Sequence, residues 1–190
     1  MRTAIIDALK DILSTALISL GIFLFVYTFV VQPHRVKGDS MLPNFYDSEL
    51  LLTEKISYRF GEPARGDVIV FKAPGSRNVD YIKRVIGLPG EVIQINDGEV
   101  SVNGKKLYEP YETQKTRGNI ETKLENDQYF VLGDNRGSSS DSRSFGPINK
   151  SSISGRTWIV YWPITKSIQA NGIRFFSRVD YRVPDAFDNL

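Results

Sequence analysis

The sequence predicts a mostly β fold in which a single N-terminal transmembrane helix precedes a β-rich domain. Two observations lead to this prediction. Residues 12–31 form an uncharged apolar run, and the chain after Pro33 breaks into short alternating segments bounded by Gly, Asn and Pro. As a helix rising about 1.5 Å per residue, the 20 residues of this run span about 30 Å, the thickness of the hydrocarbon core of a bilayer.

Two alternatives for the apolar run are disfavoured. A secretory signal peptide has a shorter apolar core that ends in a small-residue cleavage site, whereas this run continues through Phe29, Val30 and Val31. A buried core helix is rarely apolar on every face. We therefore expect residues 12–31 to cross a lipid bilayer.

Charge alone does not orient the expected transmembrane helix. Two basic residues precede it and two follow it closely: Arg2 and Lys10, then Arg35 and Lys37. Because the two counts are equal, the positive-inside rule does not decide the orientation of the helix. The simpler arrangement is a cytoplasmic tail of residues 1–11, one pass through the plasma membrane, and an extracytoplasmic domain.

Six segments after Pro33 have strand-like patterns: residues 67–73, 80–87, 91–95, 99–104, 128–134 and 156–162. Asn-Asp-Gly at residues 96–98 is typical of a hairpin turn, because Asn and Gly tolerate positive φ. We expect a β domain over residues 33–163, with a solvated loop or small hairpin at residues 108–127. The extension at residues 164–190 has no assigned role, and part of it fits either a strand or a surface helix.

Composition restricts the available chemistry. The 190 residues include 24 Lys and Arg, 22 Asp and Glu, one His and no Cys, for a net charge of +2. Such a balance does not indicate nucleic-acid binding, which favours a clustered basic patch. Disulfides, cysteine-bound zinc and a histidine-cluster metal site are excluded, and we expect neither a metal nor a cofactor. Catalysis would depend on Ser, Lys, Asp, Glu or Tyr.

Two segments contain candidate catalytic residues. Ser40 lies in Gly-Asp-Ser-Met-Leu-Pro, which is not a G-x-S-x-G elbow and, taken alone, is an ordinary loop. Lys83 and Arg84 lie on opposite faces of the expected strand at residues 80–87. A buried lysine can lose its proton but an arginine essentially cannot, so Lys83 is the candidate base and Arg84 needs an anionic partner. A surface lysine is the alternative for this segment.

Five segments, in this order behind one membrane span, closely resemble the type I signal peptidases, which are membrane-anchored Ser/Lys proteases that remove signal peptides. The segments are GDSMLPNF, RGDVIVFK, YIKRVIGLPGE, GDNRGSSSDSRSFGPI and GRTWIVYWP. The resemblance covers about residues 12–163. It implies a β-rich catalytic domain with a compact β subdomain inserted at about residues 88–131.

The resemblance also implies roles for individual residues. Ser40 corresponds to the nucleophile, Lys83 to the general base, and Ser139 to the serine whose hydroxyl orients the lysine amine. Two supporting ion pairs are implied: Asp141 with Arg143, and Arg84 with Asp134. The residues corresponding to an apolar substrate pocket are Val36, Met41, Phe45, Tyr81 and Ile82.

The implied reaction is acyl transfer through a Ser40 acyl-enzyme, because a serine hydroxyl is a weak nucleophile until a base takes its proton. The implied substrates are preproteins with small residues at the first and third positions before the cut bond. Such a substrate would pair as a β-strand near Val36 and Tyr81. Proximity to the secretion translocon is a further expectation.

Two positions depart from the family pattern. Gly38 stands where some members have a serine that assists the oxyanion hole, so the second oxyanion donor is open. Because members with glycine and with serine both occur, we expect the backbone at residue 38 to tolerate a Cβ. Asn44 stands where threonine is usual, which puts a local turn hydrogen bond in doubt.

Two other functions stay open. A membrane-anchored, non-enzymatic β binding module would explain the span and the strands, but it leaves Ser40, Lys83 and residues 134–143 without a purpose. A specialised peptidase for one exported substrate would share every motif, and only a substrate screen separates it from a general peptidase.

Overall fold

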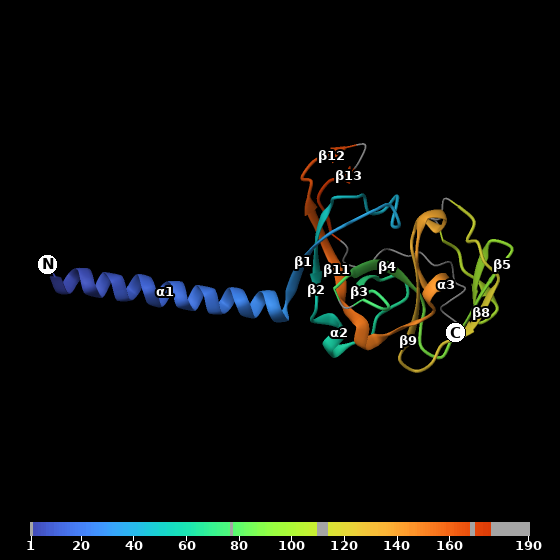
Figure 1. The fold of residues 1–190 in the computed structure, drawn as a ribbon, viewed down its shortest axis with the longest axis horizontal. Helices are drawn as coiled ribbons and strands as arrows, with labels where there is room; N and C mark the ends of the chain where they lie inside the picture. The colour runs from blue at the N-terminus through green and yellow to red at the C-terminus, as the bar shows by residue number, and fades with distance from the viewer. Residues whose placement is uncertain (1, 77, 110–113, 168–169, 176–190) are drawn as a thin grey trace.

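The computed structural model describes residues 2–76, 78–109, 114–167 and 170–175. A long helix, α1 (Arg2–Phe29), projects from a β-rich body built from one large and one small antiparallel sheet (Figure 1). The predicted fold class is confirmed: one N-terminal apolar helix precedes a mostly β domain. The helices within the body are single turns: α2 (Ser57–Phe60), α3 (Ser142–Phe145), η1 (Arg136–Ser138) and η2 (Lys150–Ser152).

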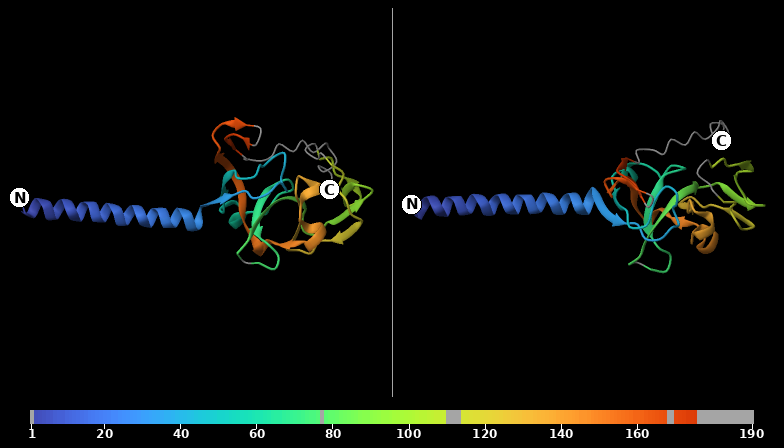
Figure 2. Two further views of the ribbon diagram at one scale, coloured as in Figure 1. Left: turned by 45° about the horizontal axis from the view of Figure 1, so that its top comes forward. Right: turned by 90° about the horizontal axis from the view of Figure 1, so that it is seen from above.

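Helix α1 stands free of the body along most of its length, as both views in Figure 2 show. Its stretch Ile5–Phe29 has the length and apolar composition to cross a membrane, and its most apolar window is 0% buried. The structure therefore contradicts the alternative of a buried core helix. Val31, which we expected inside the span, instead begins β1 (Val31–Arg35). The ring of Pro33 and its missing N–H disfavour a continued helix here.

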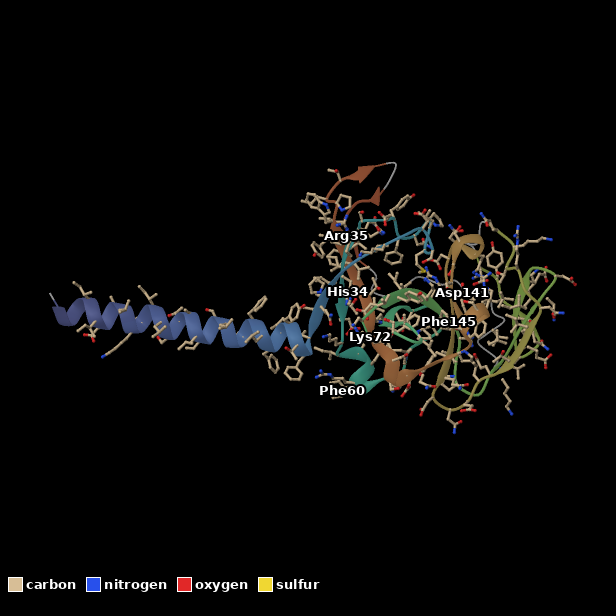
Figure 3. All side chains as sticks on the ribbon, in the orientation of Figure 1. His34, Arg35, Phe60, Lys72, Asp141 and Phe145 are labelled. Carbon is tan, nitrogen blue, oxygen red and sulfur yellow. The ribbon has the colours of Figure 1, made fainter. Side chains whose placement is uncertain are left out.

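The end of α1 is attached to the body. Lys55 donates from Nζ to Thr28 O at 3.2 Å and from its backbone N–H to Val30 O at 2.9 Å. The Arg59 guanidinium lies 5.3 Å from the centre of the Phe29 ring. Cations are favourable beside the last turn of a helix, where the dipole is negative. Phe60 of α2 is 89% exposed and lies near this end of α1 (Figure 3).

The large sheet has the strand order β1-β2-β11-β3-β4-β9-β10, and β14 also pairs with β11. Its strands beyond β1 are β2 (Leu50–Glu54), β3 (Val68–Lys72), β4 (Asp80–Gly87), β9 (Gln128–Leu132), β10 (Ile148–Asn149), β11 (Ile153–Trp162) and β14 (Arg174–Phe175). A separate hairpin consists of β12 (Lys166–Ser167) and β13 (Ala170–Asn171). All six strand-like segments of the sequence form strands, whereas β1, β2 and several shorter strands were not predicted. Residues 176–190 of the C-terminal extension lie outside the described residues.

The small sheet lies at the end of the body remote from α1 (Figure 1) and has the order β7-β6-β5-β8. Its strands are β5 (Val92–Asn96), β6 (Glu99–Val102), β7 (Lys105–Lys106) and β8 (Ile120–Lys123). The expected solvated loop or small hairpin at residues 108–127 is wrong in two respects. Residues 120–123 form β8, which pairs with β5 of the small sheet, and Glu109 and Thr116 are buried. The local polar composition does not reveal these distant partners.

Strand β4 lies at the junction of the two sheets and is covered on both faces. Ile86 on β4 packs with Ile93 and Ile95 of the small sheet, and Val85 packs in a second cluster that includes Phe71. Lys83 and Arg84, which alternate between the faces of β4, are therefore 4% and 1% exposed. The central position of β4 is what removes both cations from water.

Candidate active site

Ser40 and Lys83 meet in the structure although they are 43 residues apart in the sequence. Lys83 Nζ donates a hydrogen bond to Ser40 Oγ at 2.7 Å and another to Ile82 O at 2.9 Å. Ser40 is held in the turn that follows β1, and Lys83 extends from the central strand β4. The serine hydroxyl thus lies directly beside an amine.

Burial changes the acid–base properties of that amine. Desolvation lowers the pKa of Lys83 from 10.5 to about 8, and the carboxylates of Asp141 and Asp134 oppose part of this effect. A pKa near 8 gives Lys83 a neutral fraction near physiological pH, and a neutral amine can accept a proton. Lys83 therefore has both the geometry and the pKa of a base for Ser40.

Arg84 finds its anionic partner in Asp134. Its Nε donates to Asp134 Oδ1 at 2.7 Å and its Nη2 to Oδ2 at 2.6 Å, while Nη1 donates to Gly66 O at 2.9 Å. Asn44 Nδ2 also donates to Asp134 Oδ2 at 2.8 Å. The Asn44 departure thus places a donor on the ion pair rather than disrupting the site.

Asp141 and Arg143 also form the expected pair, with Arg143 Nε and Nη2 each 2.8 Å from the Asp141 carboxylate. Burial alone would raise the pKa of Asp141, but hydrogen bonds from Arg143 and from the Gly133 N–H outweigh it and hold this pKa below its ordinary value. Asp141 therefore stays ionised and supplies a fixed negative charge near Lys83.

Ser139 differs from the expectation. Its Oγ is buried and makes no hydrogen bond to Lys83; the hydroxyl instead helps to hold the pKa of Asp141 below its ordinary value. The hydroxyl lies close to Gly133, where an added Cβ would collide with Ser139 Oγ and Ser40 O. Glycine at residue 133 permits this close approach of two loops.

Sequence reasoning missed Asn135. Its backbone N–H donates to Ser40 O at 3.0 Å, and its Nδ2 donates to Asp39 O at 3.0 Å. Asn135 therefore holds the Ser40 turn through two hydrogen bonds to consecutive carbonyls. Its place in Gly-Asp-Asn-Arg was the available signal, but pattern alone does not say what an amide binds.

A cavity of about 240 Å³ adjoins Ser40 and Lys83. Three of the five expected pocket residues line it: Val36, Tyr81 and Ile82. Met41 and Phe45 do not; they are 1% and 0% exposed in an apolar core cluster beneath Val36. A larger hollow of about 1370 Å³ lies between Tyr58 and the β8–β9 connection, and it includes neither Ser40 nor Lys83.

His34 lies on β1 at the rim of the cavity (Figure 3). Its Nδ1 is 3.8 Å from Asp80 Oδ2; burial lowers its pKa, and Asp80 acts in the opposite direction. Within the described part of the chain His34 makes no hydrogen bond to Ser40, so the geometry is not that of a Ser-His pair. The described residues also contain no group of three or more His, Cys, Asp or Glu arranged to hold a metal ion.

The backbone at residue 38 disfavours a Cβ, against the expectation from the sequence. Gly38 has φ +80°, in the left-handed region where other residues are strained, although no atom lies within 4 Å of an added Cβ. Its N–H donates to Asp47 Oδ1 at 2.7 Å. Gly38 is therefore a conformational glycine whose N–H is already engaged.

We predict that Gly38→Ala and Gly38→Ser each lower the free energy of unfolding by about 1–2 kcal/mol. This is the cost of placing a side chain on a residue with a left-handed backbone conformation. The peptidase activity that the resemblance implies should fall with both, because residue 38 begins the Ser40 turn. Denaturant unfolding and kcat measure the two effects. Gly38→Asn is the matched control, since Asn adopts positive φ more readily. Wild-type stability in Gly38→Ala would contradict the backbone argument.

An apolar anchor helix, a β-rich body and a buried Ser–Lys pair beside a small cavity together define a membrane-anchored serine peptidase. Comparison with known proteins agrees with this class. The sequence model of the family "Signal peptidase, peptidase S26" matches residues 9–162.

Curated relatives of this chain are signal peptidases. A signal peptidase I of Leptolyngbya laminosa is 37% identical over 85% of this chain and 82% of its own length. A signal peptidase I of Bacillus licheniformis is 35% identical over 84% of this chain and 92% of its own. A crystal structure of a signal peptidase I from Enterococcus faecalis V583 is 32% identical, with a TM-score of 0.46, covering 50% of this chain and 96% of that one.

The chain belongs to the signal peptidase I family, the serine peptidases that remove signal peptides from secreted preproteins. The predicted family, enzyme class and function are confirmed. Its substrates are accordingly preproteins that carry signal peptides.

Proposed function

We propose that Ser40 is the nucleophile and Lys83 the general base of signal-peptide cleavage. The observation that carries the proposal is the 2.7 Å hydrogen bond between them, made by a buried lysine whose pKa is about 8. Neutral Lys83 Nζ takes the hydroxyl proton as Ser40 Oγ attacks the carbonyl carbon of the scissile bond. The tetrahedral intermediate collapses, the C–N bond breaks, and the leaving amine takes the proton from Lys83.

Water completes the reaction. Lys83, neutral again, accepts a proton from a water molecule that attacks the Ser40 ester, and the proton returns to Ser40 Oγ as the C–O bond breaks. The Ser40 N–H is one donor for the negative charge that develops on the carbonyl oxygen. The two hydrogen bonds from Asn135 to Asp39 O and Ser40 O support a fixed orientation of that N–H.

The substrate binds in an extended conformation beside Val36 and Tyr81. The cavity of about 240 Å³ that these residues and Ile82 line is where the side chain before the cut bond would lie. Ser40 is eleven residues beyond Phe29, the last residue of α1, a reach of about 40 Å at most, so Ser40 works near the bilayer surface. The catalytic body lies on the extracytoplasmic side and near the translocon, where preproteins emerge.

The direct test is incubation of the detergent-solubilised full chain with a preprotein and mass spectrometry of the products. The expected product is cut after a small residue at the end of the signal peptide. An acylating probe that labels Ser40 gives the same answer without a substrate. If the preprotein is not cut and Ser40 is not labelled, the result would favour the non-enzymatic binding module.

We predict that kcat/KM rises with pH through a value near 8. Protonated Lys83 cannot accept the Ser40 proton, so activity is low below its pKa and reaches a plateau above it. Initial rates with one peptide across mildly acidic to alkaline pH measure the curve, and circular dichroism at each pH serves as the folding control. A flat profile would contradict a titrating lysine base.

The anchor and its orientation can be tested on cells. Ile5–Phe29 should keep the chain in the membrane fraction through high salt and alkaline carbonate. Protease added outside spheroplasts should digest the body but not the bilayer-embedded α1. Release by carbonate would argue against a span, and full protection from external protease would reverse the orientation.

A further inference from the structure

A buried arginine, Arg136, joins residues 133–143, which adjoin the active site, to the small sheet. Arg136 of η1 is 3% exposed, and its Nε donates to Gly133 O at 3.0 Å. Its Nη1 donates to Thr116 Oγ1 and its Nη2 to Glu109 Oε1. The side chains of Arg136 and Glu109 are 0% and 1% exposed. A fully buried ion pair therefore connects residues 27 positions apart.

Glu109 and Thr116 both belong to the chain between β7 and β8. The Thr116 N–H donates to Gly98 O at 3.1 Å, in the turn between β5 and β6. The Leu107 N–H donates to Val100 O at 2.8 Å, and its side chain is buried in the core of the small sheet. These contacts fix the two partners of Arg136 to the small sheet.

Arg136 is also adjacent in sequence to the residue that holds the Ser40 turn. Its neighbour Asn135 donates two hydrogen bonds to the Ser40 turn. The carbonyl of Arg136 accepts a hydrogen bond of 2.8 Å from Arg143 Nη2, and Arg143 is the partner of Asp141. A displacement of Arg136 would therefore reach the Ser40 turn and the Asp141 carboxylate together.

We propose that Glu109 is a positioning residue for signal-peptide cleavage. Through Arg136, Glu109 fixes residues 133–143. The small sheet thereby sets the geometry of Ser40 and Lys83. A buried guanidinium stays with its carboxylate, because separating the pair would leave both charges without compensation. Glu109 acts through Arg136 and lies outside the cavity that adjoins Ser40. The inference rests on the proposed roles of Ser40 and Lys83.

The test compares Glu109→Gln with Glu121→Gln in the detergent-solubilised full chain. Both substitutions remove one carboxylate from the inserted subdomain, but Glu121 is exposed on β8. We expect Glu109→Gln to lower kcat and the rate of Ser40 labelling by an acylating probe about tenfold or more, with KM changed by less than about threefold. Glu121→Gln should match wild type. Measurements are made below the temperature at which either variant unfolds.

A second pair isolates one hydrogen bond. Thr116→Val removes the hydroxyl that Arg136 contacts, whereas Thr116→Ser retains it. We expect kcat to fall in Thr116→Val and to be kept in Thr116→Ser. This pair decides the question if Glu109→Gln does not fold.

Two outcomes would overturn the inference: a folded Glu109→Gln with wild-type kcat and labelling rate, or equal kcat in the two Thr116 variants. Failure of the proposed function is separately visible, because Ser40→Ala would then still cleave.

Discussion

Ser40→Ala and Lys83→Ala are each expected to reduce signal-peptide cleavage by about 10⁴-fold or more, because the nucleophile and its base act as one unit. Ala at residue 40 has no atom to form the acyl-enzyme. Ala at residue 83 leaves the Ser40 hydroxyl without the amine that lies 2.7 Å away. Rates of preprotein cleavage, measured by mass spectrometry on the folded variants, decide the prediction.

The cavity supplies matched controls for both substitutions. Ser140 also lines it, and Lys72 pairs with Asp80 at its rim, so Ser140→Ala and Lys72→Ala change the same residue types without touching the pair. Both controls should keep most of the activity. A chain that loses cleavage in His34→Ala but keeps it in Lys83→Ala would rule out the lysine mechanism.

The largest expected loss of stability comes from Asp134→Asn. This change keeps the shape of the side chain but removes the charge that neutralises Arg84, which is 1% exposed. Breaking a buried ion pair by altering one partner typically costs about 3–5 kcal/mol. Denaturant unfolding should show a drop of this order, and cleavage should fall with it, because Asp134 also contacts Asn44 next to the Ser40 turn.

An exposed pair provides the comparison. Lys106 and Glu99 in the small sheet are 64% and 55% exposed, so Glu99→Gln should leave the free energy of unfolding nearly unchanged. If Asp134→Asn is as stable as Glu99→Gln, then the Arg84 pair contributes much less than its burial implies.

Strong local patterns made much of the fold predictable. Strand β4 matches its predicted bounds, because β-branched residues and a following Gly-Leu-Pro-Gly turn define both ends. The apolar run predicted α1, although the helix ends two residues before Val31. Strand β2 was missed because its apolar run, Leu50–Leu52, is too short to identify alone, and its pairing with β1 and β11 makes it a strand.

Pairings between distant segments were predictable only through the family resemblance. It correctly placed Ser40 beside Lys83 and Arg84 against Asp134. It did not reveal that Met41 and Phe45 lie beneath the cavity, because residue type alone cannot separate a core position from a pocket lining. The sign of φ at Gly38 could not be decided from the residue alone, since glycine adopts either sign and the turn closes against Asp47.

The attachment of α1 determines how this enzyme meets its substrates. Only Val30 separates α1 from β1, and Lys55 and Arg59 hold the last turn of the helix, so no hinge lets the body swing at the bilayer surface. Because α1 anchors this body in the bilayer, the search for a membrane-bound preprotein is two-dimensional. The whole molecule has to diffuse laterally and rotate about the membrane normal, so encounter rates follow membrane viscosity and the number of preproteins per unit area. The concentration of preprotein in the surrounding water has little influence on them.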